Sequence, residues 1–285
     1  MRVSVLILTF NEERNLPACL AALGTMDDVH VIDSGSTDRT VAIAKQAGVR
    51  VHNRPFDGFA SQRNCGLDTC EFRYEWVLHM DADEVLTEEL RREIEALKET
   101  NSFDAYRIAS KMMFFGRWLR RSGMYPAYQV RLGHRARLRF RQVGHGQRET
   151  LPPERIGALH EPYLHYSFSG GLTAWFAKHL RYAADEADLC LRLRGERSRV
   201  GESILSRRWL KSLSYRLPLF LRPMSRVFYV LVLRRGVLDG WRGLLYAAML
   251  SVYEMMIAVL AYERLLTVRG LSNRPAPRTG PGGLA

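Results

Sequence analysis

The sequence predicts an α/β fold in which helices flank a mostly parallel β-sheet. Short apolar runs rich in β-branched residues recur through the N-terminal part, and each is followed by a stretch with a helical pattern. Strands that alternate with helices at such spacing favour a doubly wound parallel sheet. The chain has 285 residues, of which 47% are hydrophobic, and this suits one large α/β domain with or without an appendage.

The expected strands and helices alternate in the first part of the chain. Residues 3–8 form a nearly continuous apolar run, which is typical of a strand buried on both faces of a parallel sheet. Pro17 suits the first turn of the next helix, and Gly48 suits the end of the helix after it. We expect strands at 3–8, 29–32, 49–52 and 76–80, and helices at 16–23, 40–47, 61–68 and 88–100.

The pattern changes in the second part of the chain. Residues 105–142 mix arginine with aromatic residues and are expected to form a strand-and-loop region that covers one end of the sheet. A helix is expected at 172–193. Residues 244–262 are apolar except for Glu254, whose charge would cost a few kcal/mol in hydrocarbon. A buried helix and an interfacial helix are both compatible with this stretch, and a transmembrane span is less favoured. Residues 272–285, rich in Pro and Gly, are expected to be disordered.

Polar side chains follow the ends of three expected strands. Asn11 follows the first strand, Asp33 the second, and Asp81 and Asp83 the fourth. Ligands of doubly wound sheets bind beyond the carboxyl ends of the strands. The shared placement therefore predicts a ligand site at this edge of the sheet.

The Asp81-Ala82-Asp83 segment places two carboxylates on a short turn. Hard divalent cations prefer carboxylate oxygen, and such a cation can neutralise the charge that develops on a leaving diphosphate. We expect Asp83 to bind the metal directly, and Asp81 to reach a ribose or a metal-bound water. The segment alone is also compatible with a helix N-cap, because a helical stretch begins shortly after Asp83.

Three segments together resemble one enzyme family. They are Val5-Leu-Ile-Leu-Thr-Phe-Asn-Glu-Glu13, Val31-Ile-Asp-Ser-Gly-Ser-Thr-Asp-Arg-Thr40 and Asp81-Ala-Asp-Glu84. In this order and at this spacing they resemble the family 2 inverting glycosyltransferases, which have the Rossmann-like GT-A fold. Residues 143–149, 220–228 and 235–243 resemble segments of the lipopolysaccharide-core and exopolysaccharide members of this family.

The resemblance implies a nucleotide-sugar donor, a UDP- or GDP-sugar, and a Mg²⁺ or Mn²⁺ ion as cofactor. The donor-site residues that it implies are Thr9, Phe10, Asn11 and Glu12 in the nucleotide pocket, Asp33 at the base, Ser34 beside it, Arg63 near the donor and Asp81 at the ribose. The alternative for Arg63 is a helix-surface arginine. His165 is offered as a further metal ligand, with a hydrogen-bonded core histidine as the alternative.

Inversion requires a base on the acceptor side, opposite the leaving diphosphate. The candidates are Glu149, Glu154 and Glu161. Residues 143–149 resemble the region after the acceptor-side strands of the same transferases, although His145 and the glutamate are spaced more widely here. We assign the base to Glu149, and a surface salt bridge with a neighbouring arginine is the alternative.

The C-terminal third and the net charge of +12 indicate an anionic partner. Arginines lie there beside bulky apolar residues, which suits the surface of an anionic membrane. Nucleic acid is not expected, because no nucleic-acid-binding motif accompanies the charge. The four cysteines include no C-x-x-C pair, so no zinc site is expected. Because no signal peptide is recognised, the catalytic part is expected on the cytoplasmic side.

The expected function is transfer of a sugar to a lipid-linked or lipopolysaccharide-type glycan acceptor. The enzyme would act at the cytoplasmic face of the inner membrane, as a peripheral or monotopic protein. Transfer to polyprenyl phosphate, as in relatives similar to dolichyl-phosphate mannose synthase, is the alternative, and there the acceptor needs no base. A binding module without catalysis and a homo-oligomer both stay open. The expected divisions are a nucleotide-sugar half (1–104), an acceptor half (105–195), a basic, apolar helical region for membrane association or oligomerisation (196–271) and a tail (272–285).

Overall fold

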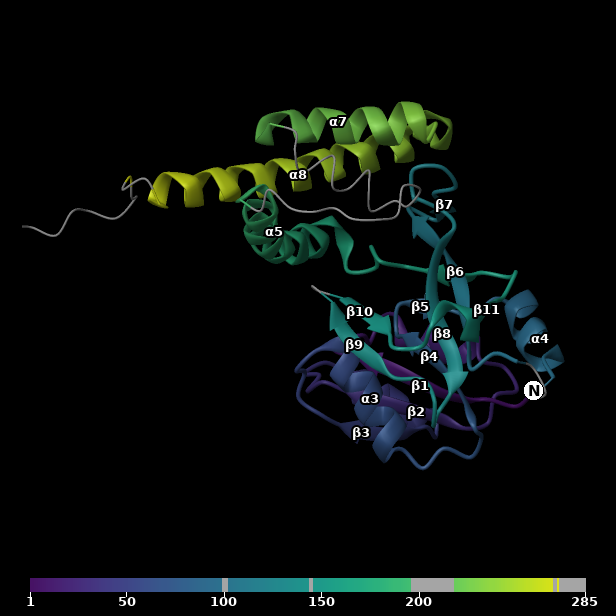
Figure 1. The fold of residues 1–285 in the computed structure, drawn as a ribbon. Helices are drawn as coiled ribbons and strands as arrows, with labels where there is room; N and C mark the ends of the chain where they lie inside the picture. Colours follow the sequence, from purple (N-terminus) through teal and green to yellow (C-terminus); the bar gives the residue numbers. More distant parts are fainter. Residues whose placement is uncertain (99–101, 144–145, 196–217, 269–270, 272–285) are drawn as a thin grey trace, which may run out of the picture. The chain divides into compact units, whose positions relative to one another are not determined.

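The computed structural model describes residues 1–98, 102–143, 146–195, 218–268 and 271 (Figure 1). These residues form two compact units. The first contains Met1–Trp175 and Arg234–Gly243, and the second contains the described residues of Phe176–Leu233 and Leu244–Ala285. The division expected at residue 104 falls within the first unit. The tail expected at 272–285 and residues 196–217 of the expected basic region lie outside the described residues.

The first unit is built on one large sheet. Its strand order is β3–β2–β1–β4–β8–β6–β12–β5, and β7 and β11 also pair with β6. The parallel half consists of β1 (Ser4–Thr9), β2 (Val29–Asp33), β3 (Arg50–Asn53) and β4 (Trp76–Asp81). The four strands expected in the N-terminal part are therefore present, and they are parallel.

The second half of the sheet corrects one expectation. It contains β5 (Glu84–Val85), β6 (Ala105–Phe114), β7 (Arg117–Trp118), β8 (Ala127–His134), β11 (Ile156–Ala158) and β12 (Tyr163–His165). The strands β6 and β8 do not cover one end of the sheet. Instead, β8 pairs antiparallel with both β4 and β6 and extends the same sheet. Among the described residues, β9 (Phe140–Val143) and β10 (Gly146–Glu149) form a separate two-stranded sheet.

Helices cover both faces of the parallel strands, which explains the continuous apolar run of β1. On one face, Val5 and Ile7 join the core that contains buried residues of α1 (Leu16–Ala21), α2 (Thr40–Gln46) and α4 (Glu88–Ala96). On the other face, Leu6 joins the core below α3 (Phe59–Thr69). Within α3, Gly66 lets the helix lie close to the sheet, since a Cβ atom there would be 2.4 Å from Leu6 Cδ2.

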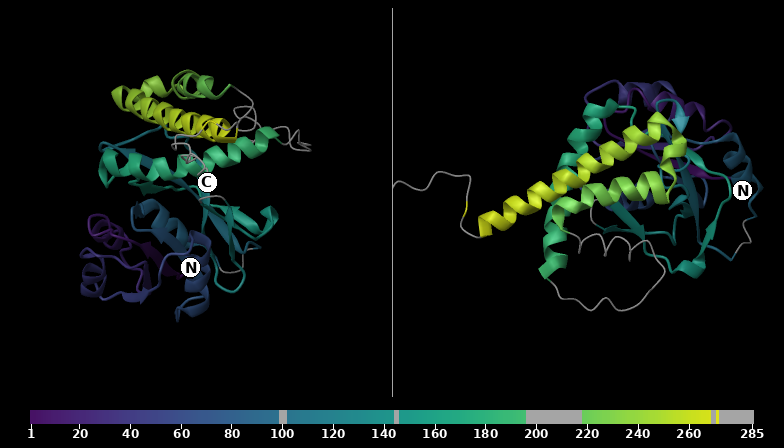
Figure 2. Two further views of the ribbon diagram at one scale, coloured as in Figure 1. Left: turned by 90° about the vertical axis from the view of Figure 1, so that its left-hand side faces the viewer. Right: turned by 90° about the horizontal axis from the view of Figure 1, so that it is seen from above.

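The second unit is helical (Figure 2). Its elements are α5 (Gly171–Gly195), η2 (Leu219–Leu221), α7 (Arg222–Phe228), η3 (Tyr229–Leu233) and α8 (Trp241–Val268), and α5 and α8 each begin in the first unit. Buried alanines of α5 pack against Ile257, Ala258 and Ala261 of α8. Glu254, the charge that argued against a span, lies 2.7 Å from the guanidinium of Arg222. An ion pair on the same unit therefore offsets part of the cost of burying that carboxylate.

Candidate active site

The carboxyl ends of β2, β1 and β4 bring the expected donor-site residues to one edge of the sheet. Thr9 lies opposite Asp33 in the β1–β2 register, and Leu8 lies opposite Asp81 in the β1–β4 register. Asn11, just past β1, adopts a left-handed conformation with φ 56°. Such a backbone is uncommon for a residue other than glycine, although asparagine tolerates it better than most. The chain therefore turns sharply where the strand ends.

Asp33 is a buried carboxylate that organises the loop after β2. Its Oδ1 accepts hydrogen bonds from the hydroxyls of Thr9 (3.0 Å) and Ser36 (2.5 Å). Its Oδ2 accepts from the backbone N–H groups of Gly35 (3.0 Å) and Ser36 (2.8 Å). A carboxylate offers about four acceptor positions, and protein donors occupy all of them here. A contact between Asp33 and a nucleotide base would require one of these donors to leave.

Hydrogen bonds between side chains and backbone groups connect the loop after β1 with the loop after β2. The Asn11 side-chain oxygen accepts from the N–H of Thr37 (2.8 Å), and the Asn11 N–H donates to Ser36 Oγ (2.8 Å). The N–H of Glu12 donates to Thr40 Oγ1 (2.7 Å). Phe10 projects from this frame with 58% of its surface exposed. An exposed aromatic ring on a rigid loop can stack on a planar base.

Asp81, whose side chain is 30% exposed, lies in a cluster of alternating charges whose other members are buried. Its Oδ1 is 2.6 Å from Arg63 Nη2, and its Oδ2 is 2.8 Å from Arg131 Nη2. Arg131 also contacts Glu84, whose other oxygen accepts the N–H of Asp81 at 3.0 Å. Burial raises the pKa of Asp81, but the guanidinium groups of Arg131 and Arg63 outweigh it and hold that pKa below its usual range. Asp81 therefore stays ionised, with both oxygens engaged.

Arg131 is a site residue that the sequence interpretation missed. On β8, Leu132 pairs with Tyr106 and Val130 pairs with Arg107, so Arg131 is the extra residue of a β-bulge. Bulges redirect side chains and are frequent beside active sites. The signal in the sequence is an arginine between two apolar residues of an expected strand. The extra residue in the pairing becomes visible only when both strands are placed.

Asp83 and His165 lie together apart from the Asp81 cluster. His165 Nε2 is 3.3 Å from Asp83 Oδ2, and both side chains are about a quarter exposed. Burial lowers the pKa of His165, but the hydrogen bond and charge of Asp83, with the charges of Glu84 and Asp81, raise it overall. Among the described residues, Asp81, Asp83 and His165 do not form a three-member ligand cluster. A carboxylate oxygen and an imidazole nitrogen nevertheless suit a Mn²⁺- or Mg²⁺-type ion that takes further ligands from a bound substrate.

A cavity of about 800 Å³ connects Asp81 with the acceptor-side strands. Glu149 lines it together with Arg63, Asp81 and Arg131, whereas Glu154 and Glu161 do not. The further lining residues are Phe59, Arg107, Tyr128, Gln129, Val130, Val143, Gly146, Gln147, Arg148, Pro153 and Ile156. The structure thus brings the expected base into the same cavity as the first aspartate of the Asp-Ala-Asp segment.

The helix α3 contributes to the lining of this cavity and also contacts the strand pair that carries Glu149. It carries Arg63, and its Asn64 pairs with the backbone of Phe140 on β9, accepting the N–H at 2.9 Å and donating to the carbonyl at 2.8 Å. Since β9 pairs with β10 and Phe140 lies opposite Glu149, this contact sets the position of the glutamate. The amide side chain of Asn64 fits the strand edge as another strand would.

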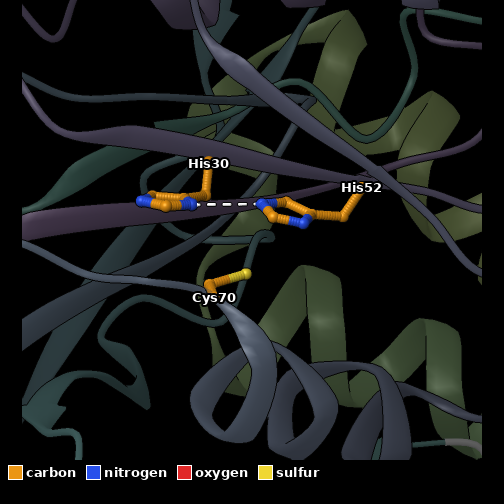
Figure 3. Close-up of side chains that lie close together, drawn as sticks. All are labelled: His30, His52 and Cys70. Carbon is orange, nitrogen blue, oxygen red and sulfur yellow. Dashed lines mark hydrogen bonds between the residues drawn. The ribbon is translucent and has the colours of Figure 1, made fainter.

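A second polar cluster lies under the β2–β3 edge, formed by His30, His52 and Cys70 (Figure 3). His30 Nδ1 is 3.2 Å from His52 Nε2, the ring centroids are 5.4 Å apart and the planes differ by 14°. The rings therefore meet end to end in nearly one plane. A metal would need both lone pairs to converge at about 2.0–2.1 Å, but here the two nitrogens face each other. This geometry is that of an N–H···N hydrogen bond.

The fold and the cavity define an α/β protein with a ligand site at the carboxyl ends of a parallel sheet, and the comparisons specify the family. Residues 4–151 match the model of Glycosyl transferase family 2. The chain belongs to glycosyl transferase family 2, as the sequence motifs predicted.

Several known proteins are similar to this chain. An uncharacterized glycosyltransferase of Rickettsia felis is 37% identical over 106 residues, which are 37% of each chain. Lipopolysaccharide core biosynthesis glycosyltransferase LpsC of Rhizobium meliloti is 28% identical over 158 residues, which are 53% of this chain and 57% of LpsC. The crystal structure of S. aureus TarS 1–349 with UDP-GlcNAc has 15% identity and a TM-score of 0.46, covering 96% of this chain and 93% of that one. The chain spans about 35–40% of the length of the Rickettsia relatives that it matches.

Proposed function

We propose that the protein transfers a sugar from a nucleotide-diphosphate-sugar to a hydroxyl of a glycan acceptor, with inversion at the anomeric carbon. The observation that carries this proposal is that Asp81 and Glu149 line the same cavity. Asp81 is the last residue of β4, the strand that pairs with β1. Family membership supports the reaction class.

The nucleotide is assigned to the frame built by the loops after β1 and β2. Phe10 would stack on the base, and Ser34 would lie near its edge. Asp33 would shape this frame through its four internal hydrogen bonds, and its direct contact with the base stays a prediction. The donor residues are Thr9, Phe10, Asn11, Glu12, Asp33, Ser34, Arg63 and Asp81.

A Mg²⁺ or Mn²⁺ ion would be held by Asp83, with His165 as a second ligand. When bound, such an ion neutralises charge on the leaving diphosphate. Asp81, already paired with Arg63 and Arg131, would face the ribose or a water on the ion rather than the ion itself. This separation of the two aspartates follows from their different neighbours in the structure.

Glu149 is assigned as the general base. Its carboxylate would take the proton of the acceptor hydroxyl while that oxygen forms a bond to the anomeric carbon. The bond from this carbon to the diphosphate oxygen breaks at the same time, and the nucleoside diphosphate leaves with the electron pair. Attack from the face opposite the leaving group produces inversion.

A donor screen tests the proposed activity. We expect one of UDP-, GDP- or dTDP-sugars, with Mn²⁺ present, to raise the melting temperature of the protein, because a ligand that binds only the folded state stabilises it by mass action. At a hundred times its Kd the gain is about 2.7 kcal/mol. If no nucleotide-sugar shifts the melting temperature and none is transferred or hydrolysed, the proposed function is wrong.

We further propose that the acceptor is a lipid-linked or lipopolysaccharide-type glycan and that the protein works at the cytoplasmic membrane face. The 28% identity with LpsC supports this acceptor class. In the second unit, α8 is long and apolar enough to cross a membrane, although a core helix passes the same test. Exposed apolar side chains of that unit include Phe220, Leu221, Met224, Phe228, Val232, Leu233, Val252, Met255, Val259 and Tyr262. Such a surface beside arginine suits an anionic bilayer.

Cosedimentation with vesicles tests the membrane proposal. We expect the protein to bind phosphatidylglycerol vesicles more strongly than neutral phosphatidylcholine vesicles, since basic residues near a surface are attracted to anionic lipid. Met224→Glu should weaken binding to the anionic vesicles, because it places a charge among exposed apolar residues. Phe56→Glu, an equal charge change at an exposed aromatic residue of the first unit, is the control. Equal and negligible binding to both vesicles would remove the proposal.

A further inference from the structure

Part of the cavity wall has no role in the proposed reaction. This part consists of Arg107 on β6, Tyr128 and Gln129 on β8, and Gln147 on β10. An aromatic ring, two amides and a guanidinium are the groups that recognise a substituted sugar, since the ring packs against apolar sugar faces and the amides bind hydroxyls. The wall therefore has the chemistry of an acceptor subsite.

Arg107 is presented to the cavity by strand register. Ala109 lies opposite Tyr128 and Arg107 lies opposite Val130, so Arg107 and Tyr128 are diagonal neighbours on one face. The Cζ atom of Arg107 is 5.1 Å from the centre of the Tyr128 ring. A guanidinium that rests on an aromatic face keeps its N–H edges available for a carboxylate or phosphate.

The charges around the cavity leave Arg107 without a counterion. Among the lining residues, the arginines are Arg63, Arg107, Arg131 and Arg148, and the carboxylates are Asp81 and Glu149. Arg63 and Arg131 are already paired with Asp81 and Glu84. Arg107 is exposed and forms no ion pair with any described residue. The positive excess on this wall is therefore available to a ligand.

Buried donors in the same cavity wall also lack acceptors. Arg63 is 1% exposed, yet its Nε and Nη1 have no hydrogen-bond partner among the described residues. The Nε of Arg131, which is 3% exposed, is also without a partner there. Buried guanidinium N–H groups are normally satisfied. The donor diphosphate accounts for one anion near Asp81, at the end of β4. Arg107 lies on β6, which β8 separates from β4, so the diphosphate does not account for this arginine.

We infer that the acceptor is a sugar with an anionic substituent, a carboxylate or a phosphate, which Arg107 binds while the Tyr128 ring packs against the sugar. This inference rests on the proposed function, because it names the substrate class for the same cavity. Arg107 would act on acceptor specificity and not on the chemical step. The pair Arg107–Tyr128 would then decide which hydroxyl is presented to Glu149.

The test uses the full chain saturated with Mn²⁺ and with UDP, GDP or dTDP, whichever matches the donor found in the screen, so that the donor site is filled. Binding of glucose, glucuronate and glucose 6-phosphate is measured by saturation-transfer NMR titration. We expect at least one anionic probe to bind about tenfold or more tightly than glucose, the size of effect of one hydrogen bond between charged groups. Preference for glucuronate identifies a carboxylate, and preference for glucose 6-phosphate identifies a phosphate.

Arg107→Gln should abolish the preference for the anionic probe. Arg107→Lys should keep part of it, because lysine retains the positive charge but lacks the paired N–H groups of the guanidinium. The matched control is Arg92→Gln, at an exposed position of α4 whose side chain is 71% exposed. Equal binding of all three probes, or an unchanged preference in Arg107→Gln, overturns the inference. The affinity for this nucleoside diphosphate should be the same in all variants. If none of UDP, GDP and dTDP binds the parent protein, the proposed function itself is wrong.

Discussion

Glu149→Gln is expected to reduce kcat for transfer to a hydroxyl acceptor by about 10²- to 10⁴-fold, the range that a positioned general base contributes. The amide keeps the shape of the side chain and its place in the cavity but cannot take the proton of the acceptor. Since the carboxylate is assigned to the acceptor and not to the donor, the affinity for the nucleotide-sugar should change little. Steady-state kinetics with the identified donor, together with donor titration, separates the two quantities.

The matched control is Glu154→Gln, because this glutamate belongs to the same acceptor-side region but does not line the cavity. It should retain the activity of the parent protein. Near-normal turnover of Glu149→Gln would exclude the base assignment. It would favour the alternative in which polyprenyl phosphate is the acceptor, because an acceptor phosphate is already a nucleophilic anion and needs no base.

Asp83→Asn is expected to remove the effect of Mn²⁺ on donor binding. In the presence of Mn²⁺, the variant should bind the donor more weakly than the parent protein does. The reason is that no arginine among the described residues pairs with Asp83, whereas two pair with Asp81. The ion-pair partner of Asp83 in this part of the chain is His165 at 3.3 Å. An amide is a much weaker ligand of a hard cation than a carboxylate. Calorimetric titration of the donor with and without MnCl₂ measures the difference.

Asp68→Asn is the control for charge, since Asp68 lies on the surface of α3 and is paired with Arg139 there. Its donor affinity should respond to Mn²⁺ as in the parent protein. A parent-like Mn²⁺ response in Asp83→Asn would show that this carboxylate is not the metal ligand. The metal would then have to bind elsewhere or not take part in donor binding.

The parallel half of the sheet was predictable because its signals are local. A continuous apolar run such as residues 3–8 needs no knowledge of distant residues to be assigned to a buried central strand. The polar residues Asn11, Asp33 and Asp81 then follow the strand ends, and topology places them at one edge. The antiparallel half was not predictable in the same way, since β8 takes its place between β4 and β6 through pairings that join distant parts of the chain.

The sequence by itself determined the family, the order of strands and helices in the first part, and the identity of the residues at the sheet edge. Only the tertiary structure decided what each carboxylate contacts. Asp33 turned out to be saturated by protein donors, and Asp81 to be held between two arginines, one of them on a β-bulge. The physical reason is that hydrogen bonds and ion pairs depend on distance and direction between side chains from different elements, which sequence spacing does not specify.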